Sequence, residues 1–305
     1  METFRVHILG CSSAMPTLKH HPACQVLNVR DKLFMIDCGE GAQTQLRRYG
    51  INFSRISAIF LSHLHGDHVF GLPGLISTFS MLGRTQSLHI YAPDDLGSVL
   101  GPWLDFFCPG LEFDVVCHQV NPATHSIVYE DRSLSVSTLP LSHRIACCGY
   151  RFDEKPLLPH IRRDMIDYLH IPTYAIQGIK EGAGWIDGEG KEWPSEALTR
   201  PAAPPRSYAY CSDTQYLPGL AALVKEVSLL YHEATFASTE ALRARQTCHS
   251  TAAQAAQVAR DAHARRLLIG HFSARYTDET PLLDEAKAVF PDTLLANEGL
   301  ALDIE

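Results

Sequence analysis

The chain has 305 residues, of which 46% are hydrophobic and 20% are charged, and its formal net charge at pH 7 is −8. This length and hydrophobic content are enough for one large core or two modest ones. The acidic balance excludes binding of nucleic acid through the whole surface, because that mode draws most of its affinity from neutralised phosphates. A nucleic-acid substrate would therefore need a local patch or a metal centre.

The sequence shows no membrane or export signal. No stretch approaches the roughly 20 continuous apolar residues that a membrane span needs. The first residues, METFRVHILG, have an acid at position 2 and no basic-then-apolar leader. The nine cysteines form no CxxC pair, so we interpret them as reduced, mostly buried thiols. We expect a cytoplasmic protein without membrane contact.

The first half of the chain alternates short strands with short helices. Strands are expected at 4–10, 24–30, 32–39, 56–63, 87–93 and 111–120, and helices at 42–50 and 73–82. A further helix over 94–107 is expected to be interrupted at Gly101-Pro102. Residues 126–142 are predicted to form a β-hairpin that turns at 130–132.

Residues 151–206 break this pattern, because they are rich in proline and glycine and have little apolar periodicity beyond one short helix near 160–169. Regular elements then resume, with strands at 207–214, 227–234, 266–273 and near 293–303, and helices at 217–226, 251–264 and 278–289. Thr251 and Gln254 predict a capping box. Long, weakly patterned insertions are usually functional arms or linkers. We expect one α/β domain over 1–305, with helices covering its sheets and an arm inserted at about 151–206.

The stretch LSHLHGDHVFG places four metal-binding side chains within six residues, directly after an apolar strand: His63, His65, Asp67 and His68. Residues two apart on a strand share a face, so His63 and His65 can converge on one ion. Asp67 and His68 follow the turn at Gly66 and can serve a second ion. Imidazole and carboxylate without thiolate suit zinc, manganese or iron. The alternative is a histidine-rich surface turn.

Three other polar residues end apolar runs further along the chain. His143 follows VSTLPLS, Asp213 follows SYAYCS, and His271 follows RLLIG. Each alone could be structural. Because metal sites in layered α/β folds collect at strand ends, the three together could complete the ligands of two ions.

This order of residues resembles the metallo-β-lactamase fold, a four-layer αββα sandwich. The finer motifs are similar to those of the ribonuclease Z family of tRNA 3′-end endonucleases: IDCGEGAQTQL (36–46), CSDT (211–214), HEATF (232–236), CHSTAAQAAQVA (248–259) and HFSARY (271–276). The resemblance covers nearly the whole chain and is weakest in 151–206.

The resemblance implies two zinc ions per chain. One would take His63, His65 and His143, the other would take Asp67, His68 and His271, and Asp213 would bridge both. Two ions about 3.5–4 Å apart can activate a water molecule for attack on a phosphodiester, and Asp67 could accept its proton. Asp37 would support the site from behind without binding metal.

The resemblance also implies a proton donor and substrate contacts. His249 is expected to protonate the leaving oxygen, and Glu233 is expected to orient the imidazole of His249. The alternative is a structural role for both residues, with His249 at the start of a helix and Glu233 in a buried salt bridge at a strand end. Arg275 is a candidate phosphate contact; the alternative is that it is an ordinary surface arginine without a role in binding. Lys19 is a candidate substrate contact in the loop after the first strand.

The function implied is that of a zinc-dependent endoribonuclease that cleaves the 3′ trailer from precursor tRNA and leaves a tRNA 3′-hydroxyl. The family also implies a homodimer in which the arm of one subunit serves the site of the other. The alternative is a phosphodiesterase for small diesters, or another hydrolase of this fold such as a lactonase. The acidic net charge favours that alternative, whereas the insertion favours tRNA. A non-catalytic binding protein would lack ligands, and none is missing here.

Overall fold

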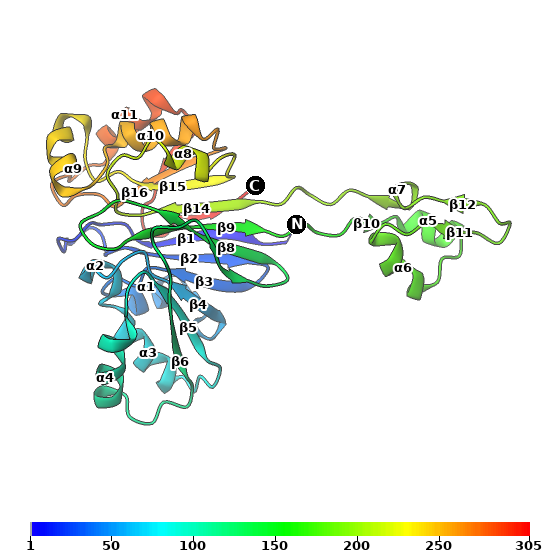
Figure 1. Ribbon diagram of the computed structural model, residues 1–305, viewed down its shortest axis with the longest axis horizontal. Helices are drawn as coiled ribbons and strands as arrows, with labels where there is room; N and C mark the ends of the chain where they lie inside the picture. Colours follow the sequence, from blue (N-terminus) through cyan, green and yellow to red (C-terminus); the bar gives the residue numbers. More distant parts are fainter. Residues whose placement is uncertain (1) are drawn as a thin grey trace. The chain divides into compact units, whose positions relative to one another are not determined.

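The computed structural model describes residues 2–305. These residues divide into two compact units (Figure 1). The larger unit contains the chain up to Asp153 and from Arg206 onward, and the smaller one contains Glu154–Pro205. The insertion expected at 151–206 therefore corresponds to a compact unit of its own.

The first sheet of the larger unit has seven strands in the order β18-β1-β2-β3-β4-β5-β6. Their bounds are β1 (Phe4–Gly10), β2 (Cys24–Val29), β3 (Lys32–Ile36), β4 (Ile56–Phe60), β5 (Leu88–Ala92), β6 (Val115–Gln119) and β18 (Ala301–Asp303). Strands β3 to β6 run parallel, and β1 to β3 pair antiparallel. Helices α1 (Ala42–Arg48), α3 (Leu72–Met81) and α4 (Gly97–Phe107) supply apolar residues to the core on one face of this sheet. The short helix α2 (Gly66–Val69) and a 3₁₀ turn (Phe53–Arg55) flank β4.

The second sheet also has seven strands, in the order β17-β16-β15-β14-β9-β8-β7. Their bounds are β7 (Ile127–Glu130), β8 (Leu134–Pro140), β9 (Cys148–Glu154), β14 (Ser207–Cys211), β15 (Leu229–Glu233), β16 (Leu267–Gly270) and β17 (Thr293–Leu295). Its helices are α8 (Leu220–Leu223), α9 (Ala241–Thr247), α10 (Ala252–Asp261) and α11 (Thr280–Val289), with a 3₁₀ turn at Ser238–Glu240. The predicted capping box is present, since Thr251 and Gln254 exchange side-chain and backbone hydrogen bonds at the start of α10.

Aromatic side chains fill the space between the two sheets. Phe60 of β4 meets Tyr150 and Phe152 of β9 with ring centroids 5.2 and 5.3 Å apart, and all three side chains are fully buried. Burying an aromatic side chain of this size stabilises a fold by about 1.5–3 kcal/mol. The larger unit is therefore a sandwich of helices, two sheets and helices, as the sequence predicted.

The smaller unit contains more structure than the single helix expected near 160–169. It has helices α5 (Arg163–Tyr168), α6 (Thr173–Lys180) and α7 (Ser195–Leu198), and strands β10 (His160–Ile161), β11 (Trp185–Ile186), β12 (Glu192–Trp193) and β13 (Thr199–Arg200). Strand β10 pairs with β13, and β11 pairs with β12. Ile171, Ile179 and Leu198 form a small core of its own.

Two predicted elements were wrong. Helix α4 runs without interruption through Pro102, because Leu100 and Leu104 are buried in the core and hold the helix in place. The single strand expected near 293–303 is two strands in different sheets, β17 and β18, separated by a turn at Gly299 with a φ of 88°. The sequence reading also missed β9 and α9. Within residues 2–305, no helix has the length and apolar character to span a membrane.

Candidate active site

The residues expected to bind metal lie at the carboxyl ends of strands in both sheets. His63 and His65 follow β4, and Asp67 and His68 lie in α2 directly after them. His143, Asp213 and His271 follow β8, β14 and β16. Strands β14, β15 and β16 run parallel, so the loops after them emerge at the same edge of the sheet.

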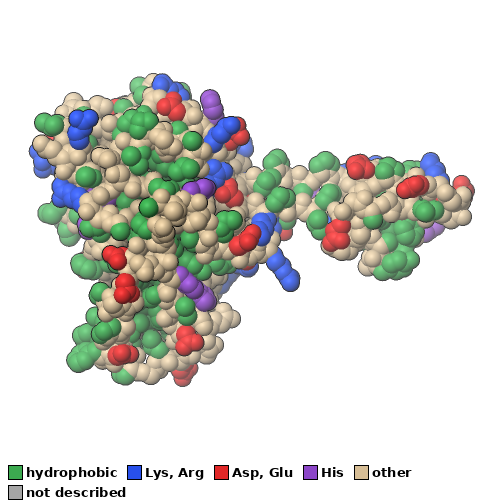
Figure 2. Space-filling view, viewed as in Figure 1, with side chains coloured by type: hydrophobic (Ala, Val, Ile, Leu, Met, Phe, Trp, Pro, Cys, Tyr) green, Lys and Arg blue, Asp and Glu red, His purple; other side chains and the backbone are tan. Residues whose placement is uncertain are grey.

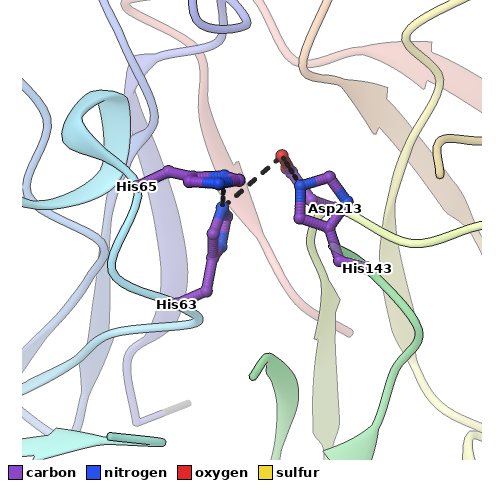
Figure 3. Close-up of side chains that lie close together, drawn as sticks. All are labelled: His63, His65, His143 and Asp213. Atoms are coloured by element: carbon purple, nitrogen blue, oxygen red, sulfur yellow. Dashed lines mark hydrogen bonds and ion pairs between the residues drawn. The ribbon is translucent and has the colours of Figure 1, made fainter. Parts of the chain in front are cut away.

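The first group of side chains contains His63, His65, His143 and Asp213 (Figure 3), each with one ligand atom within 4.8 Å of the others. Nε2 of His63 lies 3.0 Å from Nδ1 of His65 and 3.6 Å from Oδ2 of Asp213. Nε2 of His143 lies 3.7 Å from the same carboxylate oxygen. All four side chains point toward one position.

The second group contains Asp67, His68 and His271, whose ligand atoms also lie within 4.8 Å of one another. Nε2 of His68 and Nε2 of His271 lie 3.3 and 3.7 Å from Oδ2 of Asp67. The same two nitrogens lie 3.5 and 3.1 Å from Oδ1 of Asp213. Asp213 therefore presents one oxygen to each group of residues.

Hydrogen bonds on the outer side of three imidazoles fix their orientation. Nδ1 of His68 donates to Asp37 at 2.8 Å, and Nδ1 of His143 donates to the carbonyl of Cys248 at 3.0 Å. Nδ1 of His271 lies 2.9 Å from the hydroxyl of Thr235. Because Nδ1 of each ring makes this outer hydrogen bond, Nε2 points toward the centre of the site. Histidines that bind metal are commonly arranged in this way.

Asp37 lies behind the site and is fully buried. Its carboxylate also accepts hydrogen bonds from the backbone and hydroxyl of Ser62, at 2.7 and 2.9 Å, and from the hydroxyl of Tyr210 at 2.7 Å. These donors satisfy the carboxylate without a metal ion. The structure thus places Asp37 where the sequence expected a supporting residue.

The residues present fit a cation. Nε2 of His68 and Nε2 of His271 are buried and have no hydrogen-bond partner among residues 2–305, yet they face the carboxylates of Asp67 and Asp213. Lone pairs that face carboxylates repel unless a cation or a proton lies between them. Two ligands 2.0–2.1 Å from one tetrahedral ion lie roughly 3.3 Å apart, close to the distances between these atoms.

Charge within the site shifts the pKa values of its members. Burial alone would raise the pKa of Asp213 and Asp67, but the surrounding imidazoles hold both well below the usual range. Burial lowers the pKa values of His63 and His143. The carboxylates therefore stay ionised and these two imidazoles stay neutral, which are the forms that bind a metal ion.

His249 and Glu233 form a pair beside the two groups. Nδ1 of His249 lies 2.9 Å from Oε1 of Glu233, which is fully buried at the end of β15. The backbone N–H groups of Thr214 and Ser250 donate to the same oxygen, at 3.1 and 3.0 Å. Thr235 donates to the other oxygen through its hydroxyl at 2.7 Å. The carboxylate is thereby fixed, and it fixes His249 in turn.

Proteins named ribonuclease Z are similar in sequence to this chain over its full length. Ribonuclease Z of Bacteroides thetaiotaomicron is 55% identical over 304 residues, covering 100% of this chain and 96% of the relative. Ribonuclease Z of Phocaeicola vulgatus is 56% identical over 305 residues, covering 100% and 99%. The chain belongs to the ribonuclease Z family. A family model described as "Anti-Pycsar protein Apyc1" also matches residues 4–140.

Solved structures share the fold of this chain. The crystal structure of human tRNase Z, short form (ELAC1), covers 99% of both chains with a TM-score of 0.72 at 25% identity. The metallo-β-lactamase fold protein YhfI from Bacillus subtilis covers 99% of this chain and 100% of its own, with a TM-score of 0.69 at 17% identity. The fold class predicted from the sequence is confirmed.

A cavity of about 640 Å³ opens over the site of this ribonuclease Z family member. Its wall contains His65, Asp67, His143, Asp213, His249 and His271, together with Ser13, Ala14, Met15, Pro16, Pro22, Glu40, Gly66, Phe70, Arg144, Thr235, Phe236, Thr247 and Ser273. The loop after β1 thus forms one side of the cavity, and Arg144 adds a positive charge to it.

Lys19 and Arg275, the two expected substrate contacts, lie outside the group of metal-site residues. Nζ of Lys19 donates to the carboxylate of Glu279 and to the carbonyl of Thr277, and Lys19 is not in the cavity wall. Arg275 is exposed and lies two residues beyond Ser273, which is in the wall. The structure therefore brings neither side chain into the group of metal-site residues.

His20, which no motif singled out, anchors the loop that borders the cavity. Its Nδ1 lies 2.6 Å from Glu298 and its Nε2 lies 3.1 Å from Glu279. Cys11 also contacts His20, with its Sγ 3.3 Å from Nδ1. Because both ring nitrogens already have partners, we interpret this group as an ion-pair anchor.

Thr235 and Arg144 were also missed by sequence reasoning. Each is adjacent to a recognised feature, since Thr235 belongs to HEATF and Arg144 follows His143. His232 of the same motif is fully buried and its Nδ1 bonds the carbonyl of Glu233. It does not reach the cavity.

Proposed function

We propose that this ribonuclease Z family member cleaves the 3′ trailer from precursor tRNA with two zinc ions per chain and leaves a 3′-hydroxyl on the tRNA. Membership of the family makes the chain a metal-dependent endoribonuclease that acts in tRNA 3′ processing. The identity and number of the ions and the role of each residue are the proposal. The observation that carries it is Asp213, whose two oxygens face two separate groups of imidazoles.

In this proposal His63, His65 and His143 would hold one zinc ion. Asp67, His68 and His271 would hold the other, and Asp213 would be a ligand shared by the two groups of residues. Such a set of nitrogen and oxygen ligands suits zinc. When bound, the two ions supply Lewis acidity that activates water near neutral pH and stabilises charge on the phosphoryl oxygens.

The residues of the chain handle the protons. Asp67 is held ionised by His68 and His271 and accepts the proton of the attacking water. As the bond between phosphorus and O3′ breaks, Nε2 of His249 donates a proton to O3′, which becomes the tRNA 3′-hydroxyl. The phosphate stays on the trailer. Glu233 orients His249 through Nδ1 and favours its charged form.

The contacts that hold the substrate are proposed from position. Arg144 lies in the cavity wall beside His143 and is a candidate for binding a phosphate oxygen. Arg275 is kept as a second candidate, since it is exposed near Ser273. Lys19 acts through its ion pair with Glu279, which holds the loop after β1.

A homodimer is proposed from the apolar side chains exposed on the larger unit. Met81, Leu82, Val99, Phe106 and Phe107 on α3 and α4 and directly after α3 are between 55% and 77% exposed. Helices α3 and α4 contact each other, and hydrophobic side chains are prominent over this region of Figure 2. Clustered apolar surface of this kind marks an interface with another protein chain.

The inserted unit is proposed to bind the tRNA body. Within residues 154–205, six Lys and Arg are outnumbered by eight Asp and Glu, and red side chains are prominent on its visible face (Figure 2). Arg162 of this unit pairs with Asp164 at 2.6 Å. The exposed side chains of Tyr168 and Tyr174, 69% and 84% accessible, therefore supply the contact surface.

The test is cleavage of an end-labelled tRNA precursor by zinc-reconstituted protein, with both new ends mapped. We expect one cut at the 3′ end of the mature tRNA, with a 3′-hydroxyl on the tRNA and a 5′-phosphate on the trailer. A chromogenic phosphodiester is the competing substrate. Fast turnover of the small diester with no cut in the precursor would contradict the proposal.

A further inference from the structure

A second cavity, of about 400 Å³, borders the proton donor of the proposed mechanism. Its wall contains Gln215, Tyr216, Ala241, Leu242, Arg245, His249 and Gln254. His249 is the one residue that this wall shares with the wall of the cavity over the metal-site residues. The mechanism described above gives this second cavity no role.

The wall is built from the segments that hold the catalytic groups. Gln215 and Tyr216 lie two and three residues after Asp213. Helix α9, which supplies Leu242 and Arg245, ends at Thr247, and its C-cap Cys248 turns the chain with a φ of 58° directly before His249. The second cavity is therefore fixed in position next to His249.

The side chains in this wall suit a nucleoside. Tyr216 packs against the hydrophobic core and lines the cavity, and aromatic rings stack on bases of any sequence. The amide nitrogen of Gln215 donates to Ser142 at 2.9 Å, which leaves its amide oxygen to accept a hydrogen bond from a base. A volume near 400 Å³ is within the range of small-molecule sites, about 300–1,000 Å³.

Arg245 adds a charge that the protein itself does not use. It is exposed and has no ion pair or side-chain hydrogen bond among residues 2–305, whereas Arg243 on the same helix pairs with Glu240 at 2.8 Å. A free guanidinium at the edge of an aromatic pocket is suited to a phosphate oxygen.

The direction of the reaction decides which nucleoside occupies the cavity. The product carries a 3′-hydroxyl, so the leaving O3′ belongs to the nucleotide on the 5′ side of the scissile phosphate. His249 must touch that oxygen to protonate it. The ribose and base attached to O3′ therefore lie against His249, whereas the trailer remains with the phosphorus over the metal-site residues.

We propose that the second cavity binds the nucleoside immediately 5′ of the scissile phosphate, with its base stacked on Tyr216 and its 5′-phosphate held by Arg245. This inference rests on the proposed function, and it names the part of the substrate that enters the site beside His249.

The experiment uses three precursor tRNAs: one intact, one with an abasic ribose directly 5′ of the scissile phosphate, and one with an abasic ribose directly 3′ of it. Wild-type zinc-reconstituted protein should cleave the 5′-abasic precursor roughly 5- to 150-fold more slowly than the intact one, as expected for loss of one base–aromatic stack. The 3′-abasic precursor should be cleaved almost as fast as the intact one. The opposite order would overturn the inference and place the trailer in this cavity.

Variants of Tyr216 test the stack directly. Tyr216→Leu fills the space against the core without an aromatic face, and Tyr216→Phe keeps that face. The leucine variant should cleave intact and 5′-abasic precursors at the same reduced rate, with its metal content unchanged, while the phenylalanine variant should keep the preference for the intact precursor. A leucine variant that still prefers the intact precursor would overturn the inference.

Arg245→Ala and Arg243→Ala form a matched pair on one helix. The first should raise KM for precursor tRNA about tenfold, and the second should leave it unchanged. Equal effects of the two variants would show that Arg245 makes no specific contact. If wild-type protein leaves the intact precursor uncut, the proposed function itself fails, which is a different result from loss of discrimination between the abasic precursors.

Discussion

Oε1 of Glu233 lies 2.9 Å from Nδ1 of His249, and the carboxylate is completely buried. Burial alone would lower the pKa of His249, but the charge and hydrogen bond of Glu233 raise it to about 9. The imidazole therefore carries its proton at neutral pH. It can give that proton to a leaving oxygen and recover it from water after each turnover.

The pair should act as one unit in catalysis. We expect His249→Ala to lower kcat on precursor tRNA by roughly 100- to 10,000-fold, with metal content and KM nearly unchanged. Glu233→Gln should lower kcat less and, because it removes the charge that raises the pKa of His249, move the basic limb of the pH–rate profile to lower pH. The exposed Glu226→Gln is the matched control.

The double variant checks that Glu233 works through His249. Adding Glu233→Gln to His249→Ala should cost no further activity, because the residue being oriented is gone. Loss of metal from His249→Ala would instead make His249 a ligand. Independent losses from the two substitutions would give Glu233 a separate role.

The residues of the site could be found from the sequence because each lies next to a local signal. HxHxDH follows an apolar strand, and His143, Asp213 and His271 each end such a run. Strand ends on the same edge of a layered fold meet in space, and the structure brings all seven residues together in two groups. Whether they bind metal stays a prediction.

The contacts behind these residues could not be found in this way. Tyr210 donates to Asp37 across 173 positions of the sequence, and Thr235 contacts His271 across 36. Such pairs depend on how the two sheets pack, and no local pattern encodes that packing. The ion pair of Lys19 could not be found either, since its partner Glu279 lies 260 residues away, and a contact of Lys19 with substrate stays a prediction.

Asp37 offers a test of the metal site that does not depend on activity. Asp37→Asn removes the charge that orients His68 and leaves one acceptor oxygen where the carboxylate had two. We expect zinc affinity to fall by about 10- to 100-fold, so that zinc measured after dialysis drops from two toward one per chain. Asp131→Asn, whose carboxylate accepts from Ser133 and Lys32, is the control. Two ions retained against a competing chelator would contradict the role of Asp37.

His20 should make stability depend on pH. Hydrogen bonds to Glu298 and Glu279 raise the pKa of His20 above its usual value despite its burial. A histidine whose pKa is raised by folding stabilises the folded protein fully at pH values below its pKa in the unfolded chain, near 6.5. This contribution is lost as the pH rises through the pKa of the folded protein. His20→Gln should therefore lose more stability at pH 6 than at pH 9 in urea unfolding, by about 1.5–3 kcal/mol at pH 6.

His118 is a control for His20, because its protonation should affect stability in the opposite direction. Burial and the neighbouring His89 lower the pKa of His118, so its protonation opposes folding in acid. His118→Gln should cost less stability at pH 6 than at pH 9. If both variants followed the same trend, the ion pairs of His20 would not be the cause.

The exposed apolar residues of α3 and α4 give a test of the homodimer. Phe106 is 77% exposed and its ring lies 4.7 Å from that of Phe107. Phe106→Glu places a charge in the proposed interface, and burying an unpaired charge there is costly. In sedimentation velocity, wild-type protein should run as a dimer and the variant as a monomer. A wild-type monomer at micromolar concentration would contradict the homodimer.

The inserted unit can be removed at a position that the structure defines. Strands β9 and β14 pair antiparallel, with Asp153 opposite Ser207, so a two-residue Asn-Gly turn can replace residues 154–206 and close a hairpin. If this unit holds the tRNA body, its loss should reduce kcat/KM on precursor tRNA by at least about 100-fold, since remote contacts position the scissile bond. Turnover of a small chromogenic diester, which needs only the site at the strand ends, should stay within about twofold. Tyr174→Ala in the intact chain should show the same selectivity on a smaller scale. Equal loss on both substrates would mean that the unit supports the fold, and full activity on tRNA would mean that other surfaces hold the substrate.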